Sequence, residues 1–226
     1  MRRSPWPTTA LACFPDGKRM LPVVLESDLV RLDAPVAADA ARVFEYCQDP
    51  SFERYLTVPW PYQFEHAEGF LAEYVPGGWA SDTEYTWALR APGWKSAELL
   101  GVIGLRLLGP SVDEQAGVLQ LGSVGFWLGA PFRGQGLIGE AQRLVFDWAF
   151  GTGLVDAVHW ECIRGNTASA RAAWKAGFSY AGVAPSVAAY RDGTHPLSWQ
   201  GQLRAGDDRG RRPGWPAEAL TEALSA

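Results

Sequence analysis

The order of apolar and polar positions predicts one entry strand and then helices in the first part of the chain. Residues 23–32 are rich in Val and Leu and favour a strand that is bent or folded into a hairpin. Apolar residues recur at helical spacing over 37–47 and again over 66–75. The second helix is expected to end at Pro76, which two glycines follow.

The middle of the chain has a different pattern, typical of antiparallel strands. Three apolar runs follow one another, and Gly, Pro, Asp and Ser separate them. The simplest connection between such strands is a meander. The runs cover residues 85–90, 99–108 and 118–128.

The last third alternates between helices and strands. Residues 137–150 carry apolar side chains near a period of 3.6 and predict an amphipathic helix, which an apolar strand at 155–163 follows. A strand, a turn, a helix and a strand in this order favour a βαβ crossover, and hence one parallel pair in an otherwise antiparallel sheet. A capped helix and two strands complete the mixed α/β fold, over residues 167–176, 178–184 and 197–203.

A glycine-rich turn lies between the run 118–128 and the helix 137–150. Gly134, Gly136 and Gly139 let backbone amides approach a ligand closely, where the following helix leaves its first N–H groups unpaired. This combination favours a phosphate-bearing ligand. The spacing is not that of a Walker loop, and the acidic residue of a dinucleotide-binding fold is absent at the expected distance. Shaping a tight turn is the alternative role of the same glycines.

The composition limits the classes of partner. The chain has 226 residues, 47% of them hydrophobic, a formal net charge of −5 and a pI of about 5.3. This balance disfavours nucleic acid and anionic membranes as partners. Cys13, Cys47 and Cys162 are odd in number and widely spaced, so neither a disulfide framework nor a metal site is predicted, and a reducing cytoplasm fits best. Since no run of about 18 apolar residues occurs, we expect a soluble protein without a membrane span.

The two ends differ from the middle in composition. Residues 1–20 are rich in Pro and mixed charge and are interpreted as an N-terminal extension of one domain, which covers 21–204. Residues 205–226 form a polar tail rich in Gly and Pro, in which a short helix is expected near 217–224.

Three segments together resemble the GNAT acyltransferase superfamily, in particular its RimJ/RimL-type N-acetyltransferases. Val124–Leu128 is similar to the strand before the family's acetyl-CoA loop, and Arg133–Ala141 is similar to that loop and the start of its helix. Asn166–Phe178 resembles the family's Asn-x-x-Ser helix, which ends in Gly-Phe. The likeness spans about residues 22–203. It implies a mixed, mostly antiparallel central sheet of about seven strands, with helices on both faces and a βαβ core that binds CoA.

The resemblance also implies which residues hold the acyl donor, acetyl-CoA or another acyl-CoA. The loop amides would bind the pyrophosphate, and the preceding strand would pair by its backbone with the pantetheine arm. The loop departs from the family pattern at its last small position, where Ile138 stands and Gly139 comes next. Asn166 would contact the cofactor or only cap its helix, and Lys175 would meet a phosphate or only face solvent. The predicted cofactor-binding residues are Phe126, Trp127, Leu128, Arg133, Gly134, Gln135, Gly136, Leu137, Ile138, Gly139, Asn166 and Lys175.

For the chemistry, the resemblance implies direct attack by an amine within a ternary complex. Ser169 matches the serine that RimL-like enzymes place near the thioester sulfur, so it is the candidate general acid or thiolate stabiliser. Its alternative role is a hydroxyl that bonds back to the preceding turn. The carboxylates that relatives carry are absent, because Ser123 and Ala188 stand at those positions. The substitutes for the base are Glu161, which we take as the candidate catalytic carboxylate, Glu84, His195 and a water chain, and a structural role is the alternative for each of the three side chains.

The sequence therefore predicts an N-acyltransferase that moves an acetyl or other short acyl group from CoA to a primary amine. The acceptor is a protein N-terminus or a small molecule, and a homodimer is expected from the resemblance. The missing carboxylates keep a non-catalytic CoA-binding or CoA-sensing protein as the alternative. A nucleotide-dependent oxidoreductase would need a parallel sheet from its first strand, which the antiparallel middle of this chain contradicts.

Overall fold

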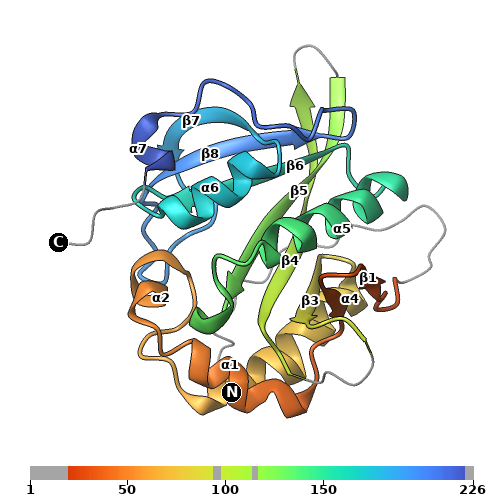
Figure 1. Cartoon of the computed structure of the whole chain (residues 1–226), viewed down its shortest axis with the longest axis vertical. Helices are drawn as coiled ribbons and strands as arrows, with labels where there is room; N and C mark the ends of the chain where they lie inside the picture. Colours follow the sequence, from red (N-terminus) through yellow and green to blue (C-terminus); the bar gives the residue numbers. More distant parts are fainter. Residues whose placement is uncertain (1–19, 94–97, 114–116, 222–226) are drawn as a thin grey trace.

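A single sheet of eight strands runs through the protein, in the order β1-β2-β3-β4-β5-β6-β8-β7 (Figure 1). The structure, a computed structural model, describes residues 20–93, 98–113 and 117–221. The strands are β1 (Leu25–Glu26), β2 (Arg31–Asp33), β3 (Glu84–Arg90), β4 (Gly101–Asp113), β5 (Gly117–Leu128), β6 (Ala157–Ile163), β7 (Ser179–Pro185) and β8 (Leu197–Arg204).

The predicted sheet is confirmed in its class, and the number of strands is one higher than the seven or so expected. The entry segment folds into a hairpin of two short strands, β1 and β2, because the amide of Ser27 bonds to the carbonyl of Val30 and reverses the chain there. All neighbouring strands pair antiparallel except β5 and β6. That parallel pair is the predicted βαβ crossover, whose helix is α5 (Leu137–Gly151).

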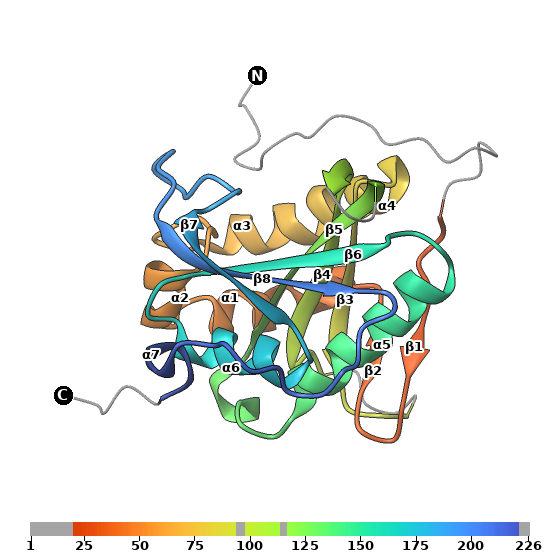
Figure 2. The ribbon, with the colours of Figure 1, turned by 90° about the horizontal axis from the view of Figure 1, so that it is seen from above.

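Helices cover both faces of the sheet. Figure 2 shows α3 and α4 on one face and α5 and α6 on the other. The helical segments are a 3-10 turn (Ala37–Asp39), α1 (Ala40–Tyr46), α2 (Pro50–Tyr55), α3 (Phe64–Gly69), a π-helical turn (Phe70–Tyr74), α4 (Val75–Ser81), a 3-10 turn (Ala130–Phe132), α5, α6 (Thr167–Lys175) and α7 (Ala217–Leu220).

The helix that was expected to end at Pro76 continues to Ser81, so that prediction was wrong. Proline lacks an N–H, and its ring crowds the carbonyl four residues earlier in an ordinary α-helix. Here the turn before it, Phe70–Tyr74, widens to π geometry, which accommodates Pro76 near the start of α4. The helix ends instead at Asp82, whose φ of 51° is left-handed.

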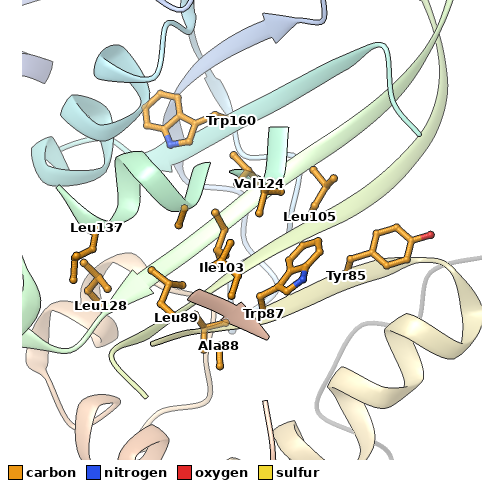
Figure 3. Close-up of a cluster of buried hydrophobic side chains, with 14 of the residues drawn as sticks. Tyr85, Trp87, Ala88, Leu89, Ile103, Leu105, Val124, Leu128, Leu137 and Trp160 are labelled. Atoms are coloured by element: carbon orange, nitrogen blue, oxygen red, sulfur yellow. The ribbon is translucent and has the colours of Figure 1, made fainter. Parts of the chain in front are cut away.

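Side chains alternate between the two faces of the central strands, and those on one face form the core beneath α5. Tyr85, Trp87 and Leu89 of β3 are fully buried, and so is Ile103 of β4. Figure 3 shows these side chains gathered with Leu137 at the start of α5. The glycine-rich turn is therefore attached at one end to a tightly packed helix and at the other to a central strand.

The C-terminal segment packs onto the domain. Trp215 is 9% exposed, its indole N–H donates to the carbonyl of Phe178, and its ring contacts those of Trp160 and Tyr180. The short helix expected in this tail is present as α7, and residues 222–226 lie outside the described residues, as do 1–19 of the predicted extension. The predicted division of the chain into a domain with two extensions stays a prediction. No helix in the described part of the chain has the length and apolar character that crossing a bilayer requires.

Candidate active site

The central feature of the site is a stretch of β5 that has a partner on only one side. β5 pairs with β6 through three residues only, from Leu121 to Ser123. Further along, residues 124–128 pair with β4 and with no other strand in the part of the chain that the structure describes. Two parallel strands thus separate toward their carboxyl ends, which is where α/β sheets commonly bind ligands. The free edge carries three of the predicted cofactor-binding residues, Phe126, Trp127 and Leu128.

The glycine turn follows directly after this edge. Gly134 and Gly136 have φ values of +77° and +81°, which side chains rarely allow, whereas Gly139 lies within the first turn of α5. Within the described residues, the amides of 134–139 donate no hydrogen bond. They lie at the positive end of a 15-residue helix. The turn can therefore hold a phosphate, and two of its three glycines are required by the backbone conformation itself.

Side chains around the turn fix its shape. Arg133 donates from Nε to the carbonyl of Leu128 at 3.1 Å, and Gln135 donates to the carbonyl of Pro131 at 2.9 Å. Leu137 is buried, and the partly buried Ile138 packs against the same core. These residues accordingly present their backbone, and not their side chains, to a ligand in the turn.

The short helix α2 connects the turn to the loop after β6. Asp49, its N-cap, accepts from the amide of Ser51 at 2.8 Å and forms an ion pair with Arg133 at 2.7 Å. At the other end of α2, the Tyr55 hydroxyl donates to the carbonyl of Gly165 at 3.1 Å. Because α2 is bonded to both loops, it sets their separation at the carboxyl ends of the two diverging strands.

Charge also holds this connection in place. Partial burial acts to raise the pKa of Asp49, but hydrogen bonds from Ser51 and the nearby Arg133 charge outweigh it and lower that pKa. The guanidinium of Arg133 additionally lies 5.7 Å from the ring centre of Phe52. Asp49 is therefore ionised at neutral pH and keeps Arg133 turned toward α2.

Asn166 and Ser169 lie together at the start of α6, in the loop opposite the glycine turn. The Asn166 side chain accepts from the amide of Ser169 at 3.2 Å, so the predicted helix cap is confirmed. The Ser169 hydroxyl accepts from the indole N–H of Trp160 at 3.1 Å. The hydroxyl also lies within hydrogen-bonding reach of the Cys162 thiol. Burial raises the pKa of the nearby Cys162 thiol to about 12, so this group stays protonated.

Glu161, the candidate base, has both carboxylate oxygens engaged by backbone. It accepts from the amide of Val187 at 2.8 Å and from that of Ala188 at 3.1 Å. Burial acts to raise the pKa of Glu161, but hydrogen bonds from His159 and these two amides outweigh it and lower that pKa. This geometry favours a carboxylate that anchors the β7–β8 loop, and its role as a base stays a prediction.

Lys175 lies at the last turn of α6. Its side chain is exposed, and it forms no ion pair within the described residues. Contact with a cofactor phosphate stays a prediction for this residue.

A pocket of about 170 Å³ opens on the sheet face opposite α5, against the same stretch of β5. Gly125 and Trp127 contribute to it from β5, and Glu84 and Thr86 contribute from β3. The pocket therefore reaches one side of the β5 segment whose free edge and glycine turn suit a phosphate-bearing ligand. This arrangement would allow two ligands to meet across one strand.

The comparisons with known proteins identify this class more closely. Residues 30–179, more than half of the chain, match the model of the acetyltransferase (GNAT) domain family. The chain belongs to the GNAT acetyltransferase family, whose acyl donor is acetyl-CoA, so the predicted family, co-substrate and acyl transfer from CoA are confirmed. A search for similar sequences among curated proteins found no match.

Solved structures of acetyltransferases share the fold at low sequence identity. A putative ribosomal-protein-serine acetyltransferase from Vibrio cholerae is 17% identical, with a TM-score of 0.66 over 80% of this chain and 97% of its own. The microcin C7 self-immunity acetyltransferase MccE, in complex with acetyl-CoA and AMP, is 18% identical, with a TM-score of 0.63 over 79% and 93%. RimL, a ribosomal L7/L12 α-N-protein acetyltransferase in complex with CoA, is 14% identical, with a TM-score of 0.64 over 80% and 98%.

Two features of the site escaped the sequence interpretation. The helix α2 is not among the elements predicted from the sequence, although Asp49-Pro50, an N-cap residue followed by proline, is a signal that starts a helix. Glu84 was considered only as a substitute base beside a strand, and its place in a pocket depends on pairing between three strands. The first could have been found from the sequence, whereas the second required the register of the sheet.

Proposed function

We propose that the protein is a RimJ/RimL-like N-acetyltransferase that transfers an acetyl or other short acyl group from CoA to a primary amine. The observation that carries this proposal is the β5 segment 124–128, with its free edge and glycine turn for the donor and a pocket against its other side for the acceptor. The acceptor is a protein N-terminus or a small amine. Action in the cytoplasm, and as a homodimer, belongs to the same proposal.

Two main-chain features of this chain would bind the two parts of the acyl donor. Amides of 134–139 would hold the pyrophosphate, and the edge of β5 would pair with the pantetheine arm. Acetyl-CoA supplies a thioester carbonyl that an amine can attack. Both contacts are made by the main chain. Ile138, which stands at the last small position of the family's loop pattern, is compatible with them because its side chain packs against the core.

Ser169 is placed in this proposal at the leaving group. The acceptor nitrogen forms a bond to the acyl carbon, the bond from that carbon to sulfur breaks, and the amine loses one proton. The Ser169 hydroxyl, whose oxygen already accepts from Trp160, donates to the departing thiolate, which finally takes the proton released by the amine. The products are an amide and the CoA thiol.

The proposal is tested by calorimetry with acetyl-CoA and by thiol release with a panel of amines and N-terminal peptides. We expect micromolar binding of acetyl-CoA and amine-dependent release of CoA thiol. Absence of binding at high micromolar acetyl-CoA contradicts the proposal altogether. Binding without thiol release for any amine favours the alternative, a CoA-sensing protein. The absence of a carboxylate at Ser123 and Ala188 is the reason to consider this alternative.

A further inference from the structure

Two glycines form the floor of the pocket opposite α5, so no side chain covers the strands there. Gly104 of β4 lies directly across from Gly125 of β5 in the antiparallel register. A Cβ added at Gly125 would meet no atom within 4 Å. Two opposed glycines in neighbouring strands remove the side chains that would normally fill this part of the face. The hollow is therefore a consequence of the sequence at two paired positions.

Two oxygen atoms from β3 face this hollow. A Cβ built on Gly104 would lie 3.1 Å from Oε1 of Glu84 and 3.6 Å from Oγ1 of Thr86. Thr86 is 2% exposed, and its hydroxyl has no hydrogen-bond partner within the described residues. Buried hydroxyls are almost always satisfied. An unsatisfied one beside a hollow can take its partner from whatever occupies the hollow.

Glu84 is held in a fixed orientation. Its other oxygen, Oε2, accepts from the Tyr74 hydroxyl at 2.6 Å and from Nε of Arg106 at 2.8 Å. Arg106 donates in turn to the Tyr74 oxygen at 2.7 Å. Within the described residues Oε1 accepts no hydrogen bond. The ion pair with Arg106 also balances the carboxylate charge, so the hollow can orient one N–H group without strongly attracting polycations.

We propose that Glu84 Oε1 and Thr86 Oγ1 accept the N–H groups of the acceptor amine, and that the acceptor is a primary amine on a compact, uncharged apolar group. This inference rests on the proposed function, because it assigns the second substrate of that reaction. Two acceptors for the N–H groups leave the nitrogen lone pair directed elsewhere, toward the β5 side of the pocket. The two oxygens would therefore position the acceptor amine.

The remaining wall of the pocket decides the class of acceptor. It is mostly apolar and comes from α1, the segment after α2, the π-helical turn and the central strands. The lining includes Val43, Leu56, Val58, Phe70, Val102 and Trp127, together with Cys47, Thr57 and Tyr62. A volume of about 170 Å³ admits a group comparable to one large side chain. A polyamine would bury a second charge against these walls, and a free amino acid would bring a carboxylate next to Glu84. Both are expected to be poor acceptors.

Glu84 also lies in one row with Ser123, the position at which the resemblance implies a carboxylate. Ser123, which stands where relatives carry a glutamate, is paired with Arg106, and Arg106 is paired with Glu84. The three residues thus form one row across three strands, on the face of the pocket. The carboxylate of this chain lies in the same row, two strands away from the usual position.

The decisive variant is Thr86→Val, which keeps the shape of the side chain and removes only the unpartnered hydroxyl. Since no hydrogen bond within the described residues is lost, we expect unfolding stability to stay equal or rise. The KM for phenethylamine should rise about tenfold, while the calorimetric Kd of acetyl-CoA stays unchanged. Thr152→Val, at the exposed far end of α5, is the control for the same substitution outside the pocket. It removes the hydrogen bond from the Thr152 hydroxyl to the carbonyl of Trp148, so stability should fall slightly, but the KM for phenethylamine and the Kd of acetyl-CoA should both stay unchanged. An unchanged KM in the Thr86 variant overturns the proposal.

Gly104→Ala provides a second test, at the floor of the pocket. The added methyl group would occupy the hollow 3.1 Å from Oε1, so phenethylamine should no longer bind to the CoA complex in calorimetry, while CoA itself still binds. Normal phenethylamine binding in this variant contradicts the proposal.

A panel of acceptors separates the two sources of the same chemistry. Phenethylamine and a peptide with N-terminal phenylalanine should both exceed spermidine and free phenylalanine in kcat/KM, and their ratio tells whether a small amine or a protein N-terminus is used. Preference for spermidine overturns the assigned acceptor class. Failure of acetyl-CoA to bind the wild-type protein refutes instead the proposed function on which this inference depends.

Discussion

The two sides of β5 are built by different means. On the donor side, the contacts available to a ligand are backbone amides of 134–139 and the free edge of 124–128. On the acceptor side, the available groups are the side-chain oxygens of Glu84 and Thr86 above two glycines. The donor side is a local feature of one continuous segment. The acceptor side comes from four or more segments that only the folded sheet brings together.

This difference predicts which side of β5 tolerates substitution. A main-chain site depends on φ and ψ, so it tolerates changes of side chain wherever the backbone conformation survives. A side-chain site changes with every substitution at its few polar positions. The donor side therefore identifies the family, and the acceptor side has to be derived from the individual chain.

The strongest test of the donor side is Gly136→Val. A β-branched residue at a φ of +81° costs about 1–2 kcal/mol or more, so the turn is expected to relax and rotate its amides away from the ligand. The Kd of acetyl-CoA should rise about 100-fold in calorimetry. Gly153→Val, which introduces the same strain at the far end of α5, should lower stability and leave acetyl-CoA binding intact. Equal affinity in both variants means that the phosphates bind elsewhere.

The next largest effect is expected at Ser169, the proposed donor to the leaving thiolate. Ser169→Ala should lower kcat about 10- to 100-fold with little change in the Kd of acetyl-CoA, since it removes a donor to the leaving thiolate. It also leaves the buried N–H of Trp160 without a partner, so the free energy of unfolding should fall by about 1–3 kcal/mol. Trp160→Phe is the control for that loss of stability, and it keeps the Ser169 hydroxyl. A variant Ser169→Ala with full kcat removes this residue from the mechanism.

The sequence predicts the glycine turn well and the pocket on the other side of β5 poorly, for a physical reason. Gly134 and Gly136 lie in a segment of a few residues, so the motif carries its own geometry. The fold class follows from periodicity in the same way, whereas the helix end at Pro76 was missed because a π turn compensated for the proline. Glu84 is separated from Gly104 and Gly125 by 20 and 41 positions, and only the sheet register makes them neighbours. No local pattern contains that information.

Glu161→Gln tests whether the acceptor side includes the carboxylate expected from the sequence. Because the Glu161 oxygens accept two backbone amides of the β7–β8 loop, we expect a loss of about 1–3 kcal/mol in stability by urea unfolding. Its kcat should stay within about threefold of the wild type, with the pH profile unshifted. A loss of kcat above about 100-fold, with the acidic limb of the profile altered, restores Glu161 as the base.

The smallest expected effect comes from Asp49→Asn, which tests whether binding on the donor side depends on any side chain. Asparagine caps a helix as well as aspartate does, so the bond from the Ser51 amide is kept and only the charge beside Arg133 is removed. For a partly exposed pair we expect a loss of about 0.5 kcal/mol in stability and a rise of about threefold in the Kd of acetyl-CoA.

The pH dependence separates this charge effect from a change of shape. Burial acts to raise the pKa of Asp49, but the Ser51 hydrogen bonds and Arg133 lower it overall, so the folded-state pKa lies below the unfolded one. The ionised group then contributes stability above the unfolded value, and this contribution disappears as the pH falls through the folded value. Wild type and Asp49→Asn should therefore differ in urea midpoint at pH 7 and begin to converge as the pH falls below about 4. A difference that persists at low pH would mean that Asp49 acts through its shape, and the donor side would then depend on side-chain packing as the acceptor side does.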